Sequence, residues 1–148
     1  MAKGDLQAPT KGVPSLDQER AKRAWSAVQR AREALGDSEF GKYRNVAKSA
    51  PALIMNSGLM PTLAFYRGKS KQKSAGAART VEGRFLDDLL AAVVAGMSTS
   101  SALASSEFPA VMEHLHGVDG QEYMRWTREA LAYLTWLRHN VDAVGGGQ

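Results

Sequence analysis

Apolar residues recur at three- and four-residue steps along most of this chain, and that spacing restricts the fold more than any other feature. On a helix at ~100° per residue, one such set covers a single arc of ~120° between residues 15 and 35. Its members are Ala21, Ala24, Trp25, Val28, Ala31 and Leu35. No window of four to eight residues combines strand-like alternation with flanking hairpin turns. The pattern predicts an all-α protein.

Start and stop signals divide the pattern into elements. Ser15 and Gln18 have capping-box spacing, and Gly36 ends the first helix. Further helices are predicted over 38–48, over a short piece around Pro51 capped by Ser49, and over 59–66, 79–96, 101–116 and 120–141. Asp119 is the expected cap of the last helix. The chain should form a compact single-domain bundle of about five to seven helices.

The domain is predicted to span residues 15–144. Residues 1–14, with Pro9, Gly12 and Pro14, form a flexible lead, and the glycine-rich residues 145–148 form a disordered tail. The Gly/Ser/Lys segment 67–76 is predicted to be an exposed, mobile loop. Because the N-terminus lacks an apolar signal segment and no apolar run approaches ~20 residues, we expect a cytoplasmic protein without membrane contact.

Signals for catalysis are weak. The chain has no cysteine, which excludes disulfides, thiolate metal sites and a cysteine nucleophile. His114 and His116 are two residues apart, so on a helix they diverge by ~200° and do not share a metal. Adjacent Asp87 and Asp88 diverge by ~100° and are read as a solvated face. We predict no enzyme, no metal site and no cofactor.

Charge is distributed unevenly along the chain. Residues 1–79 contain 15 Lys/Arg and 6 Asp/Glu, whereas residues 80–148 contain 4 Lys/Arg and 9 Asp/Glu. The basic half suits a polyanion such as RNA, with contacts to phosphates rather than bases, unless folding interleaves the halves and cancels the field. The candidate RNA-binding residues are Arg20, Arg23 and Arg30 on the first helix, Lys42, Arg44 and Lys48 on the second, and Arg67, Lys69, Lys71 and Lys73 in the loop.

Aromatic residues have both packing and binding interpretations. Trp25 and Tyr123 lie within apolar stripes and are predicted to be core residues. Trp136 lies off the main apolar face and is either half-buried or exposed for a partner. Tyr66 adjoins the basic segment, where packing is favoured over stacking on a base.

The middle of the chain resembles the small all-helical subunit of the type III-B (Cmr) CRISPR effector complex. The matching positions are Pro51, Ile54, Asn56, Gly58, Leu59, Leu63, Ala64 and Phe65, followed by the Lys-rich segment. The last helix supports the resemblance through Tyr123, Thr127, Glu129, Ala130, Leu131, Trp136, Leu137 and Arg138. It covers roughly residues 15–144. In structural terms Asn56 and Gly58 suit a turn, while Leu53, Ile54, Leu59, Leu63 and Phe65 suit a core.

The resemblance implies a non-catalytic subunit that stacks head to tail in several copies as a minor filament. That filament runs beside the backbone subunits, which hold the guide RNA and supply RNA cleavage, and it lines the channel for target RNA. The large subunit is a further expected partner. Two alternatives remain: the small subunit of the related type III-A complex, and a stand-alone helical adaptor that binds only protein.

Overall fold

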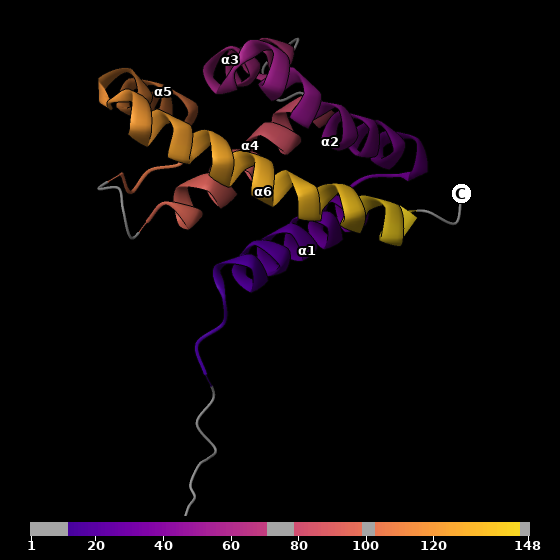
Figure 1. Cartoon of the computed structure of the whole chain (residues 1–148). Coiled ribbons are helices and arrows are strands. Elements are labelled where there is room, and N and C mark those ends of the chain that lie inside the picture. The colour runs from indigo at the N-terminus through magenta and orange to yellow at the C-terminus, as the bar shows by residue number, and fades with distance from the viewer. Residues whose placement is uncertain (1–11, 71–78, 99–102, 146–148) are drawn as a thin grey trace, which may run out of the picture.

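The computed structural model describes residues 12–70, 79–98 and 103–145, which form six helices and no strand. Helix α6 (Gly120–Gly145) crosses the middle of the molecule (Figure 1). It packs against α1 (Leu16–Ala34), α2 (Asp37–Ser57) and α4 (Val81–Gly96), and α3 (Leu59–Lys69) packs on α2 and α4. The short α5 (Phe108–Gly117) contacts α3. The predicted all-α bundle, with its helix count, is confirmed.

Helix α1 begins at the predicted capping box. The Ser15 hydroxyl accepts a hydrogen bond from Gln18 N, and the Gln18 side chain accepts one from Ser15 N. These reciprocal bonds satisfy backbone donors that the first turn leaves without helical partners. The buried face consists of Ala24, Ala27, Val28 and Ala31. Small residues dominate that face, so α1 approaches α6 closely.

The predicted boundary at Pro51 is wrong. Helix α2 continues through Pro51 to Ser57, although proline deprives the carbonyl of Ala47 of its helical donor. Ala47, Ala50 and Ile54 are all buried, so packing on both sides of the proline outweighs the lost hydrogen bond. Helix α3 is also longer than predicted, because Arg67 and Lys69 belong to its last turn rather than to a loop.

A sharp turn at Gly58 joins α2 to α3. Its φ of 97° and ψ of 163° lie in a region that only glycine adopts readily, as the motif predicted. The turn is closed by other residues than Asn56, which is exposed on α2. The Thr62 hydroxyl donates to Gly58 O at 2.8 Å, and Met60 N donates to the Tyr123 hydroxyl at 3.0 Å. Tyr123 therefore links this motif to α6.

The last two helices differ from their predicted bounds for identifiable reasons. Pro109 lies in the first turn of α5, where a missing N–H costs nothing, so this helix starts at Phe108 rather than near residue 101. Asp119 caps α6 as predicted, accepting from Glu122 N at 2.8 Å. Helix α6 then runs to Gly145 instead of Val141. A Cβ at Gly145 would lie 2.7 Å from the Phe40 ring, so only glycine fits there. Gly145 therefore belongs to α6 and not to the predicted tail, whose other residues, 146–148, lie outside the described part of the chain.

Two aromatic residues predicted to be core are half-exposed instead. They are Trp25 on α1 and Phe65 on α3, which occupy the edges of their apolar stripes. Tyr66 is buried against Phe85, with ring centroids 5.1 Å apart, which confirms the packing interpretation. Trp136 is half-buried and its Nε1 donates to Asp17 on α1 at 3.0 Å.

Candidate nucleic-acid interface

The three arginines predicted together on α1 separate into two groups. Arg20 turns toward α6, where its Nε and Nη2 donate to both oxygens of Glu129 at 2.9–3.2 Å. Glu129 is only 6% exposed, and hydrogen bonding to it raises the pKa of Arg20. Arg20 is therefore occupied inside the bundle, whereas Arg23 and Arg30 face a different surface.

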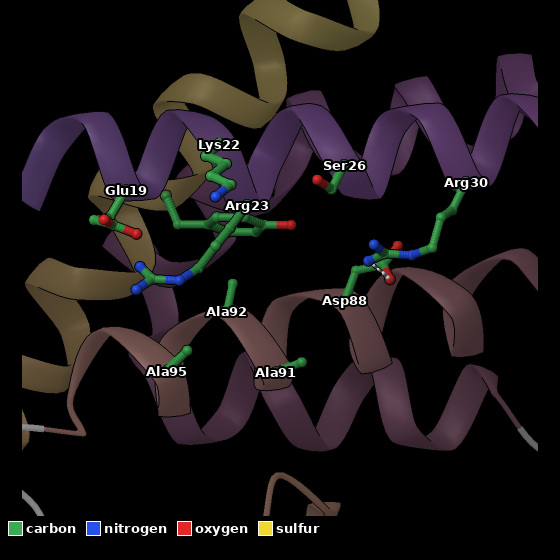
Figure 2. Close-up of a pocket in the computed structure, with 10 residues that line it drawn as sticks. Glu19, Lys22, Arg23, Ser26, Arg30, Asp88, Ala91, Ala92 and Ala95 are labelled. Atoms are coloured by element: carbon green, nitrogen blue, oxygen red, sulfur yellow. Dashed lines mark ion pairs between the residues drawn. The ribbon is translucent and has the colours of Figure 1, made fainter. Parts of the chain in front are cut away.

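That surface is a hollow of about 320 Å³ between α1 and α4. Figure 2 shows Lys22, Arg23 and Arg30 reaching from α1 toward α4. Lys22 and Arg23 have no ion-pair partner among the described residues. Arg30 lies 3.7 Å from Asp88, which is long for an ion pair. The other lining residues are Glu19, Ser26, Ala91, Ala92, Ala95 and Tyr133.

The carboxylate of Asp88 is the main counter-charge in this hollow. Burial raises its pKa, while the hydrogen bond from Tyr43 and the charges of Arg30 and Arg84 act in the opposite direction. The Tyr43 hydroxyl donates to Asp88 at 2.6 Å, which joins α2 to α4 beneath the hollow. With Glu19 as the second acid, three cations face two carboxylates, and the hollow retains one net positive charge.

The cations predicted on α2 are largely neutralised. Lys42 lies 3.6 Å from Glu39, one turn earlier on the same helix. Arg44 and Lys48 both bind Asp142 on α6, at 2.9 and 3.1 Å. These hydrogen bonds lower the pKa of Asp142, and the bond from Lys48 has the larger effect. Arg44 and Lys48 therefore hold α6 against α2, and of these three cations only Lys42 is classed as exposed.

Of the four candidate cations in the predicted basic loop, the structure describes the first two, Arg67 and Lys69. Arg67 stacks over Phe108 of α5 at 5.2 Å, and Lys69 lies 5.6 Å from the ring centroid of Phe65. Cation–π contact leaves a charged group at the surface able to meet an anion. Arg67 also lines a second hollow with Arg79, which shares Asp88 and Ala91 with the first. Lys71 and Lys73 lie outside the described residues.

Folding partly interleaves the basic and acidic halves of the chain. Five ion pairs of the described residues cross between them: Arg20–Glu129, Arg30–Asp88, Arg79–Asp87, Arg44–Asp142 and Lys48–Asp142. The acids of α6 therefore neutralise the cations that they contact. Beside α4 the neutralisation is incomplete, because Lys22 and Arg23 have no ion-pair partner among the described residues. Lys22 also lines the hollow but is not among the candidate RNA-binding residues that the sequence indicates. Its spacing from Glu19, Ser26 and Arg23 was the available signal, because those positions share one helical face.

Other features of the described residues concern metals and membranes. No group of three or more His, Asp or Glu side chains there lies close enough to bind a metal ion. His114 and His116 occupy the last turn of α5, and the His114 ring lies 5.4 Å from that of Trp126. None of the helices in this part of the chain has the length and apolar content needed to cross a membrane.

The fold and surface define a small all-helical protein with an electropositive hollow between two helices. Residues 16–144 match the model of a family described as CRISPR-associated protein (Cas_Cmr5), so the chain belongs to the Cmr5 family. It is similar to the "CRISPR system Cmr subunit Cmr5" of Thermus thermophilus, with 31% identity over 82% of this chain and 90% of that protein. The crystal structure of a Cmr5 family protein from the same organism superposes with a TM-score of 0.64 and 24% identity, covering 88% of this chain and 97% of that one. The predicted family is confirmed.

Proposed function

We propose that this protein is a non-catalytic small subunit of the cytoplasmic type III-B (Cmr) CRISPR ribonucleoprotein, and that its α1–α4 face lines the channel for target RNA. The observation that carries the RNA assignment is the pair Lys22 and Arg23, which lie at a hollow without ion-pair partners in the described structure. Unneutralised cations on flexible stems bind phosphates by releasing condensed counterions. Family membership supports the assignment to the complex, in which the backbone and large subunits are the expected partners and the backbone subunits hold the guide RNA.

The remaining candidate cations are ranked by their contacts. Arg30, Arg67 and Lys69 remain good candidates, because long ion-pair or cation–π contacts leave their charges available. Arg20, Arg44 and Lys48 are weaker candidates, because each already binds a carboxylate on α6. Lys42 is exposed and could reach RNA from α2. Lys71 and Lys73 are retained on sequence grounds alone.

Head-to-tail stacking of copies is the second part of the proposal. The exposed acid Glu113 lies on α5, whereas the unneutralised cations Lys22 and Arg23 lie on α1. Opposite charges on two different patches of one molecule favour heterologous contacts, which propagate as a filament when they do not close into a ring. Sedimentation of the full chain at low and high salt tests this step. Association that weakens with salt supports it, and a strict monomer in both conditions alone and in the rebuilt complex contradicts it.

The RNA assignment is tested by exchanging two matched pairs of cations in the rebuilt complex. Lys22→Gln with Arg23→Gln removes two charges from the hollow, while Arg128→Gln with Arg138→Gln removes two exposed charges from α6 outside it. Two lost phosphate contacts should reduce the salt slope of target-RNA binding by roughly 1.4. The α6 pair should leave that slope unchanged.

Three results would count against the proposal. Equal salt slopes for both pairs would place the RNA elsewhere. Failure of the Lys22/Arg23 pair to enter the complex, with normal folding, would make this face a protein interface. Binding that is insensitive to salt, without RNA crosslinks, would favour the stand-alone protein adaptor.

A further inference from the structure

The floor of the α1–α4 hollow holds a tyrosine with an unusual environment. Tyr133 comes from α6 and is 1% exposed, yet it lines the hollow beneath Ser26 and the alanines of α4. Its hydroxyl oxygen is buried and has no hydrogen-bond partner among the described residues. Burial raises its pKa, so the group is a neutral hydroxyl that can donate and accept.

Among the buried phenols of the described residues, the Tyr66 hydroxyl also has no partner, whereas that of the nearby Tyr43 has one. Its hydroxyl donates to Asp88 at 2.6 Å, and both groups lie under the same hollow. A buried hydroxyl without a partner is costly, and natural proteins rarely keep one without a purpose. Phenylalanine would satisfy the packing at position 133 without that cost. Because Tyr133 lines the hollow, a ligand bound there can supply the hydrogen-bond partner that its hydroxyl lacks.

Size and shape suggest what that ligand is. About 320 Å³ lies near the lower end of the ~300–1,000 Å³ occupied by small-ligand pockets. The small side chains of Ala91, Ala92 and Ala95 line the α4 side of the hollow, and Lys22 and Arg23 line its α1 side (Figure 2). Polar hydroxyls at the base and cations above them match a planar polar group attached to a phosphate chain.

Resting on the proposed RNA-binding function, we propose that the hollow receives one unstacked base of single-stranded RNA. The hydroxyls of Tyr133 and Ser26 bond to the edge of the base, and Lys22 and Arg23 contact the flanking phosphates. Proteins commonly recognise single-stranded RNA through bases turned out of the stack. The base is neutral, so it enters beside Asp88 and Glu19 without repulsion. A phosphate or an acidic side chain of a second protein would meet both carboxylates.

The test compares Tyr133→Phe with the wild-type full chain, using an oligouridylate and the same strand with abasic residues as probes. Loss of one hydrogen bond should weaken binding of the base-bearing strand about 5–10-fold. The salt slope should stay unchanged, because no charge is removed. The abasic strand should bind both proteins equally. Thermal stability should be unchanged or higher, because the unpaired hydroxyl is gone, so weaker binding would not come from unfolding.

A second variant fills the hollow without touching its polar groups. Ala91 is exposed on α4, so Ala91→Leu should fold normally and block entry of the base. We expect it to weaken binding of the oligouridylate with the salt slope unchanged. Ala52→Leu, at an exposed position on α2, is the matched control and should bind as the wild type does.

The outcomes separate this inference from the function beneath it. If Tyr133→Phe and Ala91→Leu bind both strands like the wild type, while the Lys22/Arg23 pair still lowers the salt slope, no base enters and the RNA-binding function stands. If the Lys22/Arg23 pair also has no effect, the RNA-binding face itself is refuted. If the hollow variants prevent assembly and leave RNA binding intact, the occupant is a protein side chain and the inference is wrong.

Discussion

Arg20 is the residue for which the sequence and the structure suggest opposite roles, so its substitution is the sharpest test. Removing it as Arg20→Ala leaves Glu129 buried without its bidentate partner. Breaking a fully buried ion pair from one side costs about 3–5 kcal/mol. The Arg20 side chain is 22% exposed, so water screens the pair in part. We expect a loss of about 2–3 kcal/mol, which includes the hydrogen bonds to a charged group.

The assay is reversible urea and thermal unfolding of the full chain, followed by circular dichroism. A loss of about 2–3 kcal/mol should lower the melting temperature by roughly 6–12 °C at this chain length. Arg20→Met with Glu129→Met should recover most of the stability, because apolar replacement of both partners is often neutral. The target-RNA salt slope of complexes containing Arg20→Ala should match that of the wild type.

The opposite pattern would refute this reasoning. If Arg20→Ala unfolds within about 0.5 kcal/mol of the wild type, the pair behaves like an ordinary surface contact. If its RNA affinity and salt slope also fall, Arg20 is a phosphate contact as the helix flank predicted. A double variant as unstable as Arg20→Ala would show that the ion pair itself stabilises the fold, and that an unpaired carboxylate is not the cause of the loss.

Four further changes test the geometry described above. Asp88→Asn should raise RNA affinity and steepen its salt dependence, measured by titration, because the hollow gains one net positive charge while Tyr43 keeps an acceptor. Gly96→Ala should destabilise by about 1–3 kcal/mol in urea, because its Cβ would lie 2.8 Å from Glu129 Cγ, and this should outweigh better helix propensity. Gly58→Ala should cost about 1–2 kcal/mol, since its φ is 97°. Asp142→Asn should be less stable than wild type at neutral pH. Because the folded-state pKa is lowered, that deficit should shrink as pH falls below about 4 and disappear below the folded pKa.

Local signals predicted the parts of the fold that depend on neighbouring residues. The capping box at Ser15, the glycine at 58 and the Asp119 cap each act within one turn of the chain, so short windows contain their full cause. The helix ends predicted at Pro51 and before Gly145 are wrong for the opposite reason. Their environments depend on packing around buried residues from other parts of the bundle, such as the Phe40 ring against Gly145, which outweighs propensity.

The candidate site was only half predictable from the sequence for a similar reason. Helix spacing identifies which cations share a flank of α1, but it does not show which flank meets an acid from a distant segment. Glu129 lies 109 residues after Arg20, and Asp142 lies 94 residues after Lys48. Tyr133 is buried on the inner side of its helix, but only the assembled bundle shows that its hydroxyl has no partner among the described residues.

These contacts divide the basic residues by what they do for the molecule. Cations that bind Glu129 and Asp142 attach α1 and α2 to the central helix α6, and their charge is not available to an outside anion. Lys22 and Arg23 attach nothing among the described residues, so their substitution should change binding without changing stability. A polyanion that met the first group would have to break the bundle's own contacts, whereas one that met the second would not. Under the proposed function, the α1–α4 face is therefore a surface of the described residues where a polyanion binds without breaking the contacts between α6 and the other helices.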